Sequence, residues 1–255
     1  TFAVVGSLGI IWVIPWLIIN KKGPKEHPWI TEKERDYILT GQPECRVSCD
    51  TAKSWGTLLR ERKNYAVILG RFFLDPIWWM FVTWLPIYLI EVFNLDIKQI
   101  AMSAWVPYVG AAIGSVAGGW FSGLLINRGK TVNFARKAAM IVGSCFIIPG
   151  MILAAVASSA TMAVIMMAFI LGGYQFVMTN IQTLASDLQT GKAVGSLAGL
   201  GGASAVLGTI ISILCIPYLT QSGDWTAFFI LGAALVPACL LCVFLFGGRI
   251  EQLNK

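Results

Sequence analysis

The chain has 255 residues, of which 56% are hydrophobic and only 13% are charged, and its mean hydropathy is +0.72. A soluble domain usually carries about a quarter charged residues, so this composition argues against a soluble globule and against a disordered chain. The net charge of +6 does not indicate a nucleic-acid partner, because all of the basic residues except Arg71 lie in the loops and the tail outside the apolar runs. The remaining class is a polytopic membrane protein whose solvent is the lipid bilayer.

Seven apolar runs are long enough to cross a bilayer, which requires about 20 mostly apolar residues. In chain order they are residues 2–19, 64–91, 100–126, 138–157, 161–184, 193–219 and 225–247. No signal-peptide n-region or cleavage site precedes the first run, and Thr1 is not an initiator Met. We therefore expect the first run to be a span and the chain to begin in the middle of a longer protein.

The sequence thus predicts an all-α fold with seven transmembrane helices. The expected parts are a first helix over 1–19, a long loop over 20–63, a six-helix bundle over 64–247 and a tail over 248–255.

The connections between the runs alternate in charge. The long loop 20–63 holds ten Lys and Arg residues, and the other basic connections are 127–137, 185–192 and the tail after Phe246. The opposite connections carry a single basic residue, Lys98, and they are 92–99, 158–160 and 220–224. Cytoplasmic loops are enriched in Lys and Arg, so we expect the N-terminus outside, the C-terminus in the cytoplasm, and the protein in the plasma (inner) membrane.

The long loop contains one segment with helical character. Residues 29–38 read as a short amphipathic helix in which Thr31 can cap the first turn, with Glu34 three residues later. This is the spacing of a capping box. We interpret 20–63 as a solvated linker with interfacial Trp anchors, since nothing specific indicates a regulatory role.

The six Cys residues do not form a recognisable framework. Four lie in apolar runs, and Cys45 and Cys49 lie in the long loop, where a cytoplasmic thiol stays reduced. A Cys-x3-Cys metal half-site would need further ligands, and the only histidine is His27. We expect structural or incidental cysteines, with neither a metal nor another cofactor.

Charged residues at membrane depth are costly and therefore mark candidate functional sites. Arg71 and Asp75 lie four residues apart in the second run, so they share a helix face and can pair. Asp75 lies roughly 16 Å beyond residue 64, close to mid-membrane. Either the two charges only neutralise each other, or Arg71 brings positive potential to an aqueous cavity and Asp75 orients it. An Arg fork suits a carboxylate ligand.

Two further groups of side chains are candidates for binding a substrate. Aromatic residues of the second run can stack on a sugar-like ring or face lipid and packing partners, and they are Trp78, Trp79, Trp84 and Tyr88. A polar stripe on the fifth run follows one helix face, and it consists of Gln175, Thr179, Gln182 and Thr183. Such a stripe suits a polyhydroxylated substrate, and hydrogen bonds to other helices would explain it as well.

Small residues repeat in two other runs. Gly110, Gly114 and Gly118 are spaced by four residues. The sixth run contains Gly195, Gly199, Gly201, Gly202 and Gly208. This spacing allows close helix packing, and the same smooth surfaces would let two bundles rock against each other.

In this order, the features resemble the C-terminal half of a major facilitator superfamily transporter, and more specifically its anion:cation symporter family. The segments that carry the resemblance are RFFLDPIWW (71–79), WLP (84–86), WVPY (105–108), GLLINRGK (123–130), VNFARK (132–137) and ASD (185–187). They look like hexuronate, galactonate and glucarate carriers across essentially the whole chain. The pattern departs from the superfamily at Asn127, where an Asp is usual.

This resemblance implies helix six followed by helices seven to twelve, and proton-coupled import of a sugar acid by alternating access. The pocket would lie between this bundle and a missing N-terminal half, which in the family holds the main proton-coupling carboxylates and the substrate-binding Arg. Thr179 and Gln182 match substrate-contacting positions of galactonate-type members. Gly202 stands where those members have an Asn, which puts galactonate in doubt. The expected substrate-binding residues are Arg71, Asp75, Trp79, Tyr88, Gln175, Thr179 and Gln182.

Three other functions were weighed. A seven-span receptor shares the topology, but the last run has no Lys for a retinal Schiff base and no Asn-Pro-x-x-Tyr stretch. An intramembrane enzyme would need a His or a paired catalytic Asp motif within a span, and His27 lies in the loop. We therefore expect no enzyme. A carrier for another organic anion, or an exporter of drugs or metabolites, stays open as an alternative.

Overall fold

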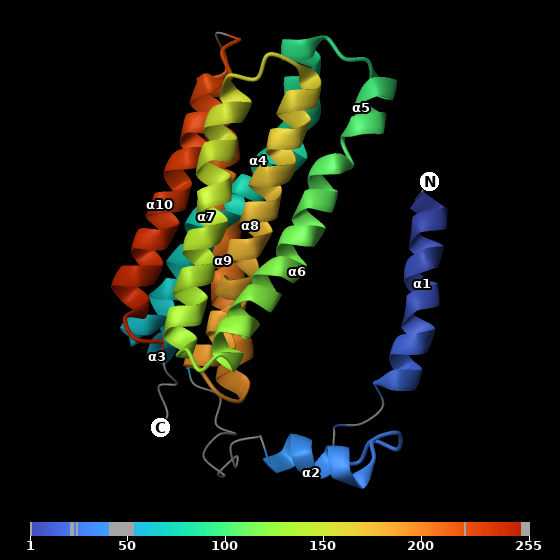
Figure 1. The fold of residues 1–255 in the computed structure, drawn as a ribbon, viewed down its shortest axis with the longest axis vertical. Helices are drawn as coiled ribbons and strands as arrows, with labels where there is room; N and C mark the ends of the chain where they lie inside the picture. The colour runs from blue at the N-terminus through green and yellow to red at the C-terminus, as the bar shows by residue number, and fades with distance from the viewer. Residues whose placement is uncertain (1, 21–22, 24, 41–53, 222, 251–255) are drawn as a thin grey trace. The chain divides into compact units, whose positions relative to one another are not determined.

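The computed structural model describes residues 2–20, 23, 25–40, 54–221 and 223–250 (Figure 1). Contacts divide the chain into two units, Thr1–Cys49 and Asp50–Lys255, and each is described by itself. Every regular element of the described residues is a helix, as the all-α prediction requires. The pair Cys45 and Cys49, discussed above as a metal half-site, lies outside the described residues.

The first unit contains helix α1 (Phe2–Ile19) and helix α2 (Glu32–Thr40). α1 has 18 residues, so it is about 27 Å long, and it contains Pro15 but no charged residue. Most of its large side chains, among them Ile10 and Trp12, are more than half exposed. By length and composition, six other helices of the described residues can each cross a membrane, and part of α1, Gly6–Ile19, counts as a shorter apolar helix. Six of the seven predicted spans are therefore confirmed.

Helix α2 begins with the capping box that the sequence predicts. The amide and the hydroxyl of Thr31 donate to Glu34 Oε2 over 3.1 and 2.8 Å, and the amide of Glu34 donates to Thr31 Oγ1 over 3.4 Å. The hydrogen bond from the Thr31 side chain, followed by the one from its backbone, holds the pKa of the Glu34 carboxyl below its usual value. The helix ends at Thr40, two residues beyond the predicted end.

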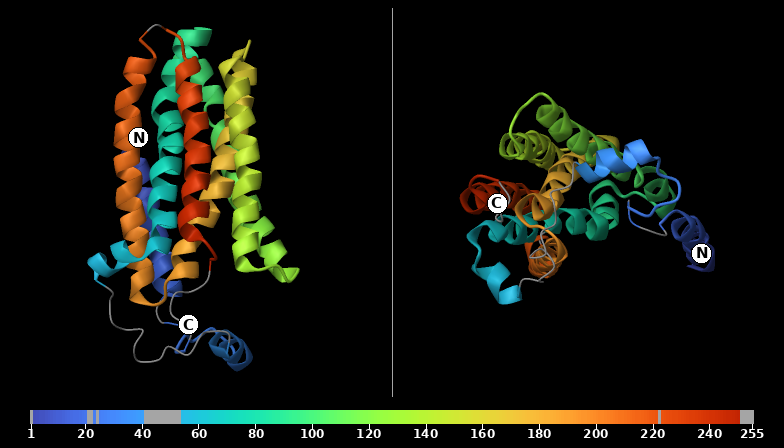
Figure 2. Two further views of the ribbon diagram at one scale, coloured as in Figure 1. Left: turned by 90° about the vertical axis from the view of Figure 1, so that its left-hand side faces the viewer. Right: turned by 90° about the horizontal axis from the view of Figure 1, so that it is seen from below.

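The second unit is a bundle of long helices that lie side by side (Figures 1 and 2). Its elements are α3 (Trp55–Arg60), the 3-10 turn η2 (Arg62–Asn64), α4 (Tyr65–Phe93), α5 (Ile97–Ser103), α6 (Val106–Asn127), α7 (Val132–Ala155), α8 (Ala160–Leu188), α9 (Lys192–Leu219) and α10 (Thr226–Gly247). We call the end that carries Arg128, Lys130 and Lys192 the basic end. The turns there join α6 to α7 and α8 to α9.

One predicted span is broken in two. The sequence predicts a continuous helix over 100–126, whereas α5 ends at Ser103 and α6 begins at Val106. Pro107 explains the break, because proline has no N–H to donate to the carbonyl of Ser103 and its ring clashes with the preceding turn. Pro is well tolerated in the first turn of the new helix. The segment Ile97–Asn127 still meets the length and composition of a single crossing.

Glycines allow the closest helix contacts of the bundle. A Cβ built on Gly114 of α6 would lie 2.0 Å from the carbonyl oxygen of Gly172 on α8, and one on Gly110 would lie 2.3 Å from that of Ala168. No side chain fits at such distances, so the backbones of α6 and α8 touch only because glycine stands there. The packing function predicted for the glycines of this run is confirmed.

A proline determines where α9 meets α4. Pro76 has no N–H, so the carbonyl of Phe72 lacks its usual partner four residues later. Gly208 of α9 approaches this oxygen so closely that a Cβ there would lie 2.1 Å away. Close Cα–H contacts to carbonyl oxygens are favourable at helix interfaces. In contrast, a Cβ on Gly195 or Gly199 of the same helix would meet no described atom within 4 Å.

The core lies among α4, α7, α8 and α10. Met80, Phe81, Met151 and Phe229 are among its buried side chains. Large apolar side chains are exposed along the outer faces of α6, α9 and α10, including Ile113, Val116, Leu207, Leu214 and Leu241. A hydrophobic surface of this kind matches a bilayer as solvent, where helices satisfy every backbone group internally.

Candidate substrate site

The charged pair in α4 is formed as the sequence predicts. Arg71 Nη2 donates to Asp75 Oδ2 over 2.8 Å, and the two side chains are 20% and 9% exposed. Asp75 is the eleventh residue of α4, so it lies about 15 Å along the helix axis from its start. A charged pair with this little exposure loses most of its hydration, and each charge therefore depends on the partners that the protein supplies.

Tyr174 of α8 completes the surroundings of Asp75. Its hydroxyl donates to Asp75 Oδ1 over 3.4 Å, so both carboxylate oxygens have a partner. Trp78 stacks on the Tyr174 ring at 5.6 Å between ring centroids, and Tyr108 of α6 meets Trp78 edge-on at 5.8 Å. Side chains of two helices, α4 and α8, thus hold the carboxylate, and Tyr108 of α6 packs against them through Trp78.

Sequence reasoning missed Tyr174 as a site residue. It lies in the fifth run beside Gln175, but only the packing of α8 against α4 reveals its hydrogen bond across 99 residues. A tyrosine in the middle of an apolar helix was the available signal, since a buried Tyr hydroxyl usually has a partner.

The guanidinium of Arg71 has room on its α9 side. A Cβ on Gly202 would lie 3.6 Å from Nη1, and one on Gly201 would lie 3.2 Å from the Cδ of Arg71. Among the described residues, the guanidinium has Asp75 as its one hydrogen-bond partner, and the buried Nε has none. A buried donor without an acceptor is costly, so this nitrogen is an exception among the buried polar groups of the described bundle.

The polar stripe on α8 divides into two kinds of residue. Thr179 donates to the carbonyl of Gln175 over 2.7 Å, and its Oγ1 lies 3.5 Å from Ser115 Oγ on α6, so it contributes to helix packing. The side chains of Gln175 and Gln182 make no hydrogen bond to any residue within the described part of the chain. Gln175 is partly buried and Gln182 is exposed. Thr183 donates to the carbonyl of Asn180 over 2.9 Å, within its own helix.

The predicted aromatic residues of α4 lie apart from one another. Trp78 packs against Tyr174, whereas Trp79 is 48% exposed. Tyr88 lies about 25 Å along α4 from Arg71. It is 3% exposed, donates to the carbonyl of Ala154 over 3.3 Å, and packs against Trp225. Trp84 also packs against Trp225.

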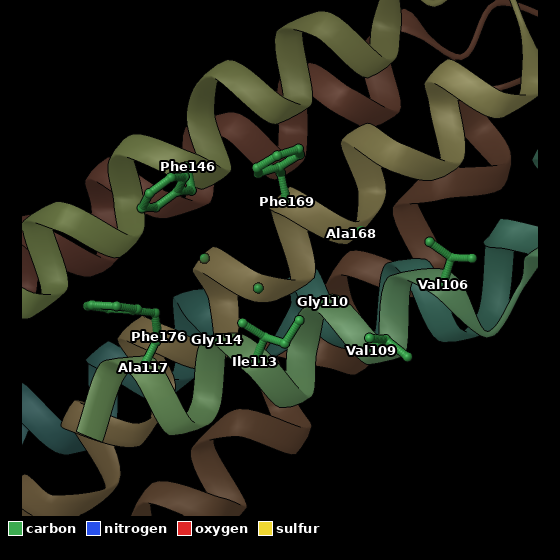
Figure 3. A pocket seen from close by; sticks show the side chains of 12 residues that line it. Val106, Val109, Gly110, Ile113, Gly114, Ala117, Phe146, Ala168, Phe169 and Phe176 are labelled. Atoms are coloured by element: carbon green, nitrogen blue, oxygen red, sulfur yellow. The ribbon is translucent and has the colours of Figure 1, made fainter. Parts of the chain in front are cut away.

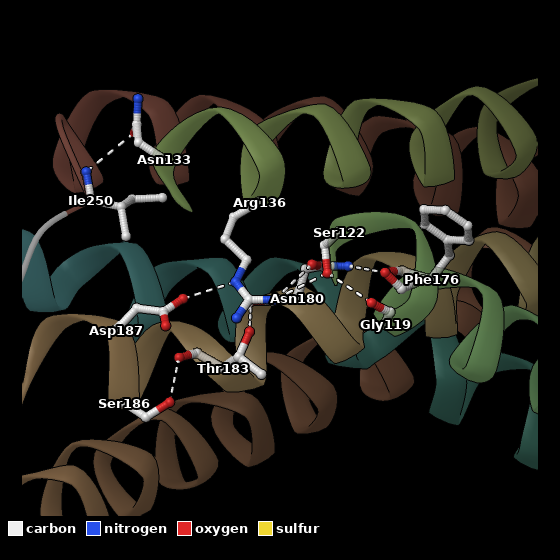
Figure 4. Close-up of polar contacts among 11 residues, drawn as sticks. Gly119, Ser122, Asn133, Arg136, Phe176, Asn180, Thr183, Ser186, Asp187 and Ile250 are labelled. Atoms are coloured by element: carbon white, nitrogen blue, oxygen red, sulfur yellow. Dashed lines mark hydrogen bonds and ion pairs between the residues drawn. The ribbon is translucent and has the colours of Figure 1, made fainter. Parts of the chain in front are cut away.

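A second, partly buried ion pair lies near the basic end (Figure 4). Arg136 Nε donates to Asp187 Oδ2 over 2.8 Å, and its Nη1 donates to Ser122 Oγ over 3.1 Å and to Asn180 Oδ1 over 3.4 Å. Asn180 in turn donates to the carbonyl of Gly118. This network, which ties α6, α7 and α8 together, was not predicted, because its partners come from separate helices.

The best-formed apolar pocket does not coincide with these charges. It has a volume of about 410 Å³ and lies between α6 and α8, with Phe146 of α7 at its rim (Figure 3). Ile113, Phe169 and Phe176 are among the side chains that line it. Binding sites for polar ligands need a few convergent polar groups, and this lining has none. It is therefore not the candidate site for an anion.

Among the described residues, no three His, Cys, Asp or Glu side chains are grouped so that they could hold a metal ion. Cys145, Cys215, Cys239 and Cys242 are free thiols.

Comparison with known proteins agrees with this architecture. Residues 1–200 match the model of the Major Facilitator Superfamily. The chain is 33% identical over 235 residues to the hexuronate transporter of Escherichia coli strain K12, with 89% of this chain and 53% of that protein covered. It is 33% identical over 156 residues to the galacturonate transporter of Dickeya chrysanthemi, with 59% and 44% covered.

A third relative is the D-galactonate transporter of Escherichia coli O6:H1, which is 30% identical over 264 residues, with 99% of this chain and 60% of that protein covered. The chain thus spans about half the length of the curated relatives that it matches. The family resemblance inferred from the motifs is confirmed. The chain belongs to the major facilitator superfamily and is related to its sugar-acid transporters.

Proposed function

We propose that this chain is the C-terminal part of a secondary carrier that imports a sugar acid, a hexuronate or an aldonate, by proton symport. The relatives named above support the substrate class. The observation that carries the proposal is the guanidinium of Arg71 at membrane depth. Among the described residues only Asp75 accepts a hydrogen bond from it, and its buried Nε has no acceptor. A planar guanidinium with free donors is the side chain best suited to a carboxylate.

The remaining binding groups follow from exposure and free hydrogen-bonding capacity. Gln175 and Gln182 supply amides that can bond sugar hydroxyls, and Trp79 presents an exposed indole. Thr179 reaches a substrate only if it gives up its contact with α6. Tyr88 lies far along α4, so we place it outside the site and assign it a packing function.

The proposed topology has helix α1 as a seventh span and the region 20–63 as a central cytoplasmic loop. The bundle 64–247 and the tail 248–255 complete the chain, with the N-terminus of this sequence outside and the C-terminus inside the plasma (inner) membrane. The excess of Lys and Arg at the basic end supports this orientation. A preceding half with its own helices would close the pocket, and rocking of the two halves would provide alternating access.

The proposal predicts proton-dependent uptake of galacturonate that requires Arg71. We would express the protein from its complete coding sequence in cells without their own hexuronate carrier, and measure radiolabelled galacturonate uptake with and without a proton uncoupler. Arg71→Ala should lower the uptake rate at least a hundredfold, and Arg71→Lys, which keeps the charge but loses the fork, at least tenfold. Arg62→Lys at the basic end is the matched control and should transport normally.

Two results would contradict the proposal. An uptake rate of Arg71→Ala equal to that of the wild type would contradict the proposed site. An uptake rate unaffected by the uncoupler would contradict proton symport. If galacturonate, galactonate and glucarate are all refused while another organic anion or a drug is moved, the alternative carrier function replaces sugar-acid import.

A further inference from the structure

The pair Arg71–Asp75 has a charge balance that changes when an anion binds. Without substrate, the single positive charge of Arg71 and the single negative charge of Asp75 cancel at membrane depth. If a substrate carboxylate takes the guanidinium, two negative charges share one positive charge. Uncompensated charge in a poorly hydrated interior is strongly unfavourable, and neutralisation by a proton is the ordinary response.

We propose that Asp75 is a proton-accepting group of the carrier. In this step, which rests on the proposed function, the substrate carboxylate replaces Asp75 as the partner of Arg71. Asp75 Oδ2 then takes one proton from the water on the side from which the substrate entered. One O–H bond of a hydronium ion in that water breaks as one O–H bond forms at Asp75, and the reverse transfer to water occurs when the substrate leaves on the other side.

The surroundings of Asp75 suit such an exchange. Arg71 precedes it on α4, Tyr174 faces it from α8, and Cys239 of α10 is a buried thiol close enough to interact with it electrostatically. On the α9 side of Arg71 stand Gly201 and Gly202, which bring no charge. The Tyr174 hydroxyl bonds the other oxygen, Oδ1, so it can hold the carboxyl group in place after Arg71 has turned away.

The arginine of the second ion pair has more hydrogen-bond partners than Arg71 has. Arg136 has Asp187, Ser122 and Asn180 as partners, so its guanidinium is held from three directions. Arg71 has one partner, and its Nε has none among the described residues. A guanidinium with a single partner exchanges that partner for a ligand more readily than one in a network.

The test uses the full-length carrier in proteoliposomes. Asp75→Asn keeps a side chain of the same shape that can bond Arg71 and Tyr174, but it cannot take up a proton. In this variant, accumulation under an inward proton gradient should fall at least tenfold more than the exchange of external labelled galacturonate for internal galacturonate at equal pH. Asp187→Asn is the matched control, an arginine-paired carboxylate in a span, and should keep the proton-to-substrate ratio of the wild type.

Accumulation by Asp75→Asn at the wild-type level would overturn the inference. If Asp75→Asn shows no exchange at all, two other measurements decide. Galacturonate binding to the purified wild-type protein in weak buffer should take up a proton, and Asp75→Glu, which keeps a titratable carboxyl, should do the same. Binding without proton uptake would overturn the inference.

Failure of the proposed function is recognised earlier, in the wild type. A wild-type protein that transports no sugar acid contradicts the function itself, and the inference falls with it. A wild type that couples uptake to protons, together with an Asp75→Asn variant that couples equally well, contradicts the inference alone.

Discussion

The binding properties of an arginine inside a helix bundle depend on its hydrogen-bond partners and on the space around its guanidinium. For Arg71, Asp75 binds one end of the guanidinium, and Gly202 places no side chain against Nη1 at the other end. A larger residue than glycine at position 202 would stand against Nη1. The absence of a side chain at Gly202 therefore affects access to Nη1 of Arg71 as well as helix packing.

Gly202→Ala should weaken substrate binding without unfolding the bundle. The added methyl would lie 3.6 Å from Nη1, an ordinary van der Waals contact, so the fold accommodates it. It would shield one donor of the fork, and we expect a rise in KM of roughly fivefold, or about 1 kcal/mol, with little change in kcat. Galacturonate uptake kinetics provide the measurement.

Gly199→Ala is the matched control on the same helix, where a Cβ meets no described atom within 4 Å, and its KM should equal that of the wild type. An unchanged KM in Gly202→Ala would show that substrate does not approach Nη1 from this side.

At the scale of the helices, backbone contacts decide the geometry. α6 lies directly on α8 through Gly110 and Gly114, and α9 lies on the carbonyl that Pro76 frees in α4. These contacts position α8, which carries Tyr174, and α9, which carries Gly202, around the charged pair of α4. The site is therefore a result of glycine and proline placement in three helices.

Gly114→Ala should destabilise the bundle severely. Its Cβ would lie 2.0 Å from the backbone oxygen of Gly172, which cannot move without shifting α8. Overpacking usually costs about 1–3 kcal/mol, and a clash with backbone belongs at the upper end of that range. The melting temperature of the purified protein in detergent should fall accordingly.

Gly123→Ala in the same helix is the control, because a Cβ there meets no described atom within 4 Å. It should melt at the wild-type temperature or slightly above it, since Ala favours helix by about 1 kcal/mol over Gly. Equal melting temperatures for the two variants would contradict the described packing of α6 on α8.

Local rules predict local features of this chain well. Hydropathy locates the six long spans, the i, i+4 spacing finds the Arg71–Asp75 pair, and the capping-box spacing finds the start of α2. Each of these depends on residues close together in sequence. The break before α6 was missed because Pro107 was read as one more residue of a continuous apolar run.

Long-range partners could not be predicted in the same way. Tyr174 contacts Asp75, and Arg136 contacts Asp187, only when the helices are packed beside the right neighbours and in the right rotation about their axes. Periodicity shows that Thr179 lies on a polar face of α8, but not that this face meets Ser115 of α6 at that level. Rotation of each helix depends on the sum of all its contacts, which no single motif contains.

At the scale of the whole molecule, the second unit is a bundle with apolar outer faces and a buried charged pair in its middle. Such a pair is weak evidence for stability, since replacing it with apolar residues is often neutral or favourable. A charged pair at membrane depth marks a candidate functional site, as the proposed carrier function requires. Family membership supports a carrier over the receptor and enzyme alternatives.

The measurement that tests the central claim most directly is acidification of the interior of proteoliposomes on addition of galacturonate. The vesicles would contain the full-length protein and a pH-sensitive dye, with equal pH on both sides at the start. Our account predicts that galacturonate entering through the wild-type protein acidifies the interior, and that Arg71→Ala gives no signal. Galacturonate entry without acidification, or equal acidification with Arg71→Ala, would contradict it.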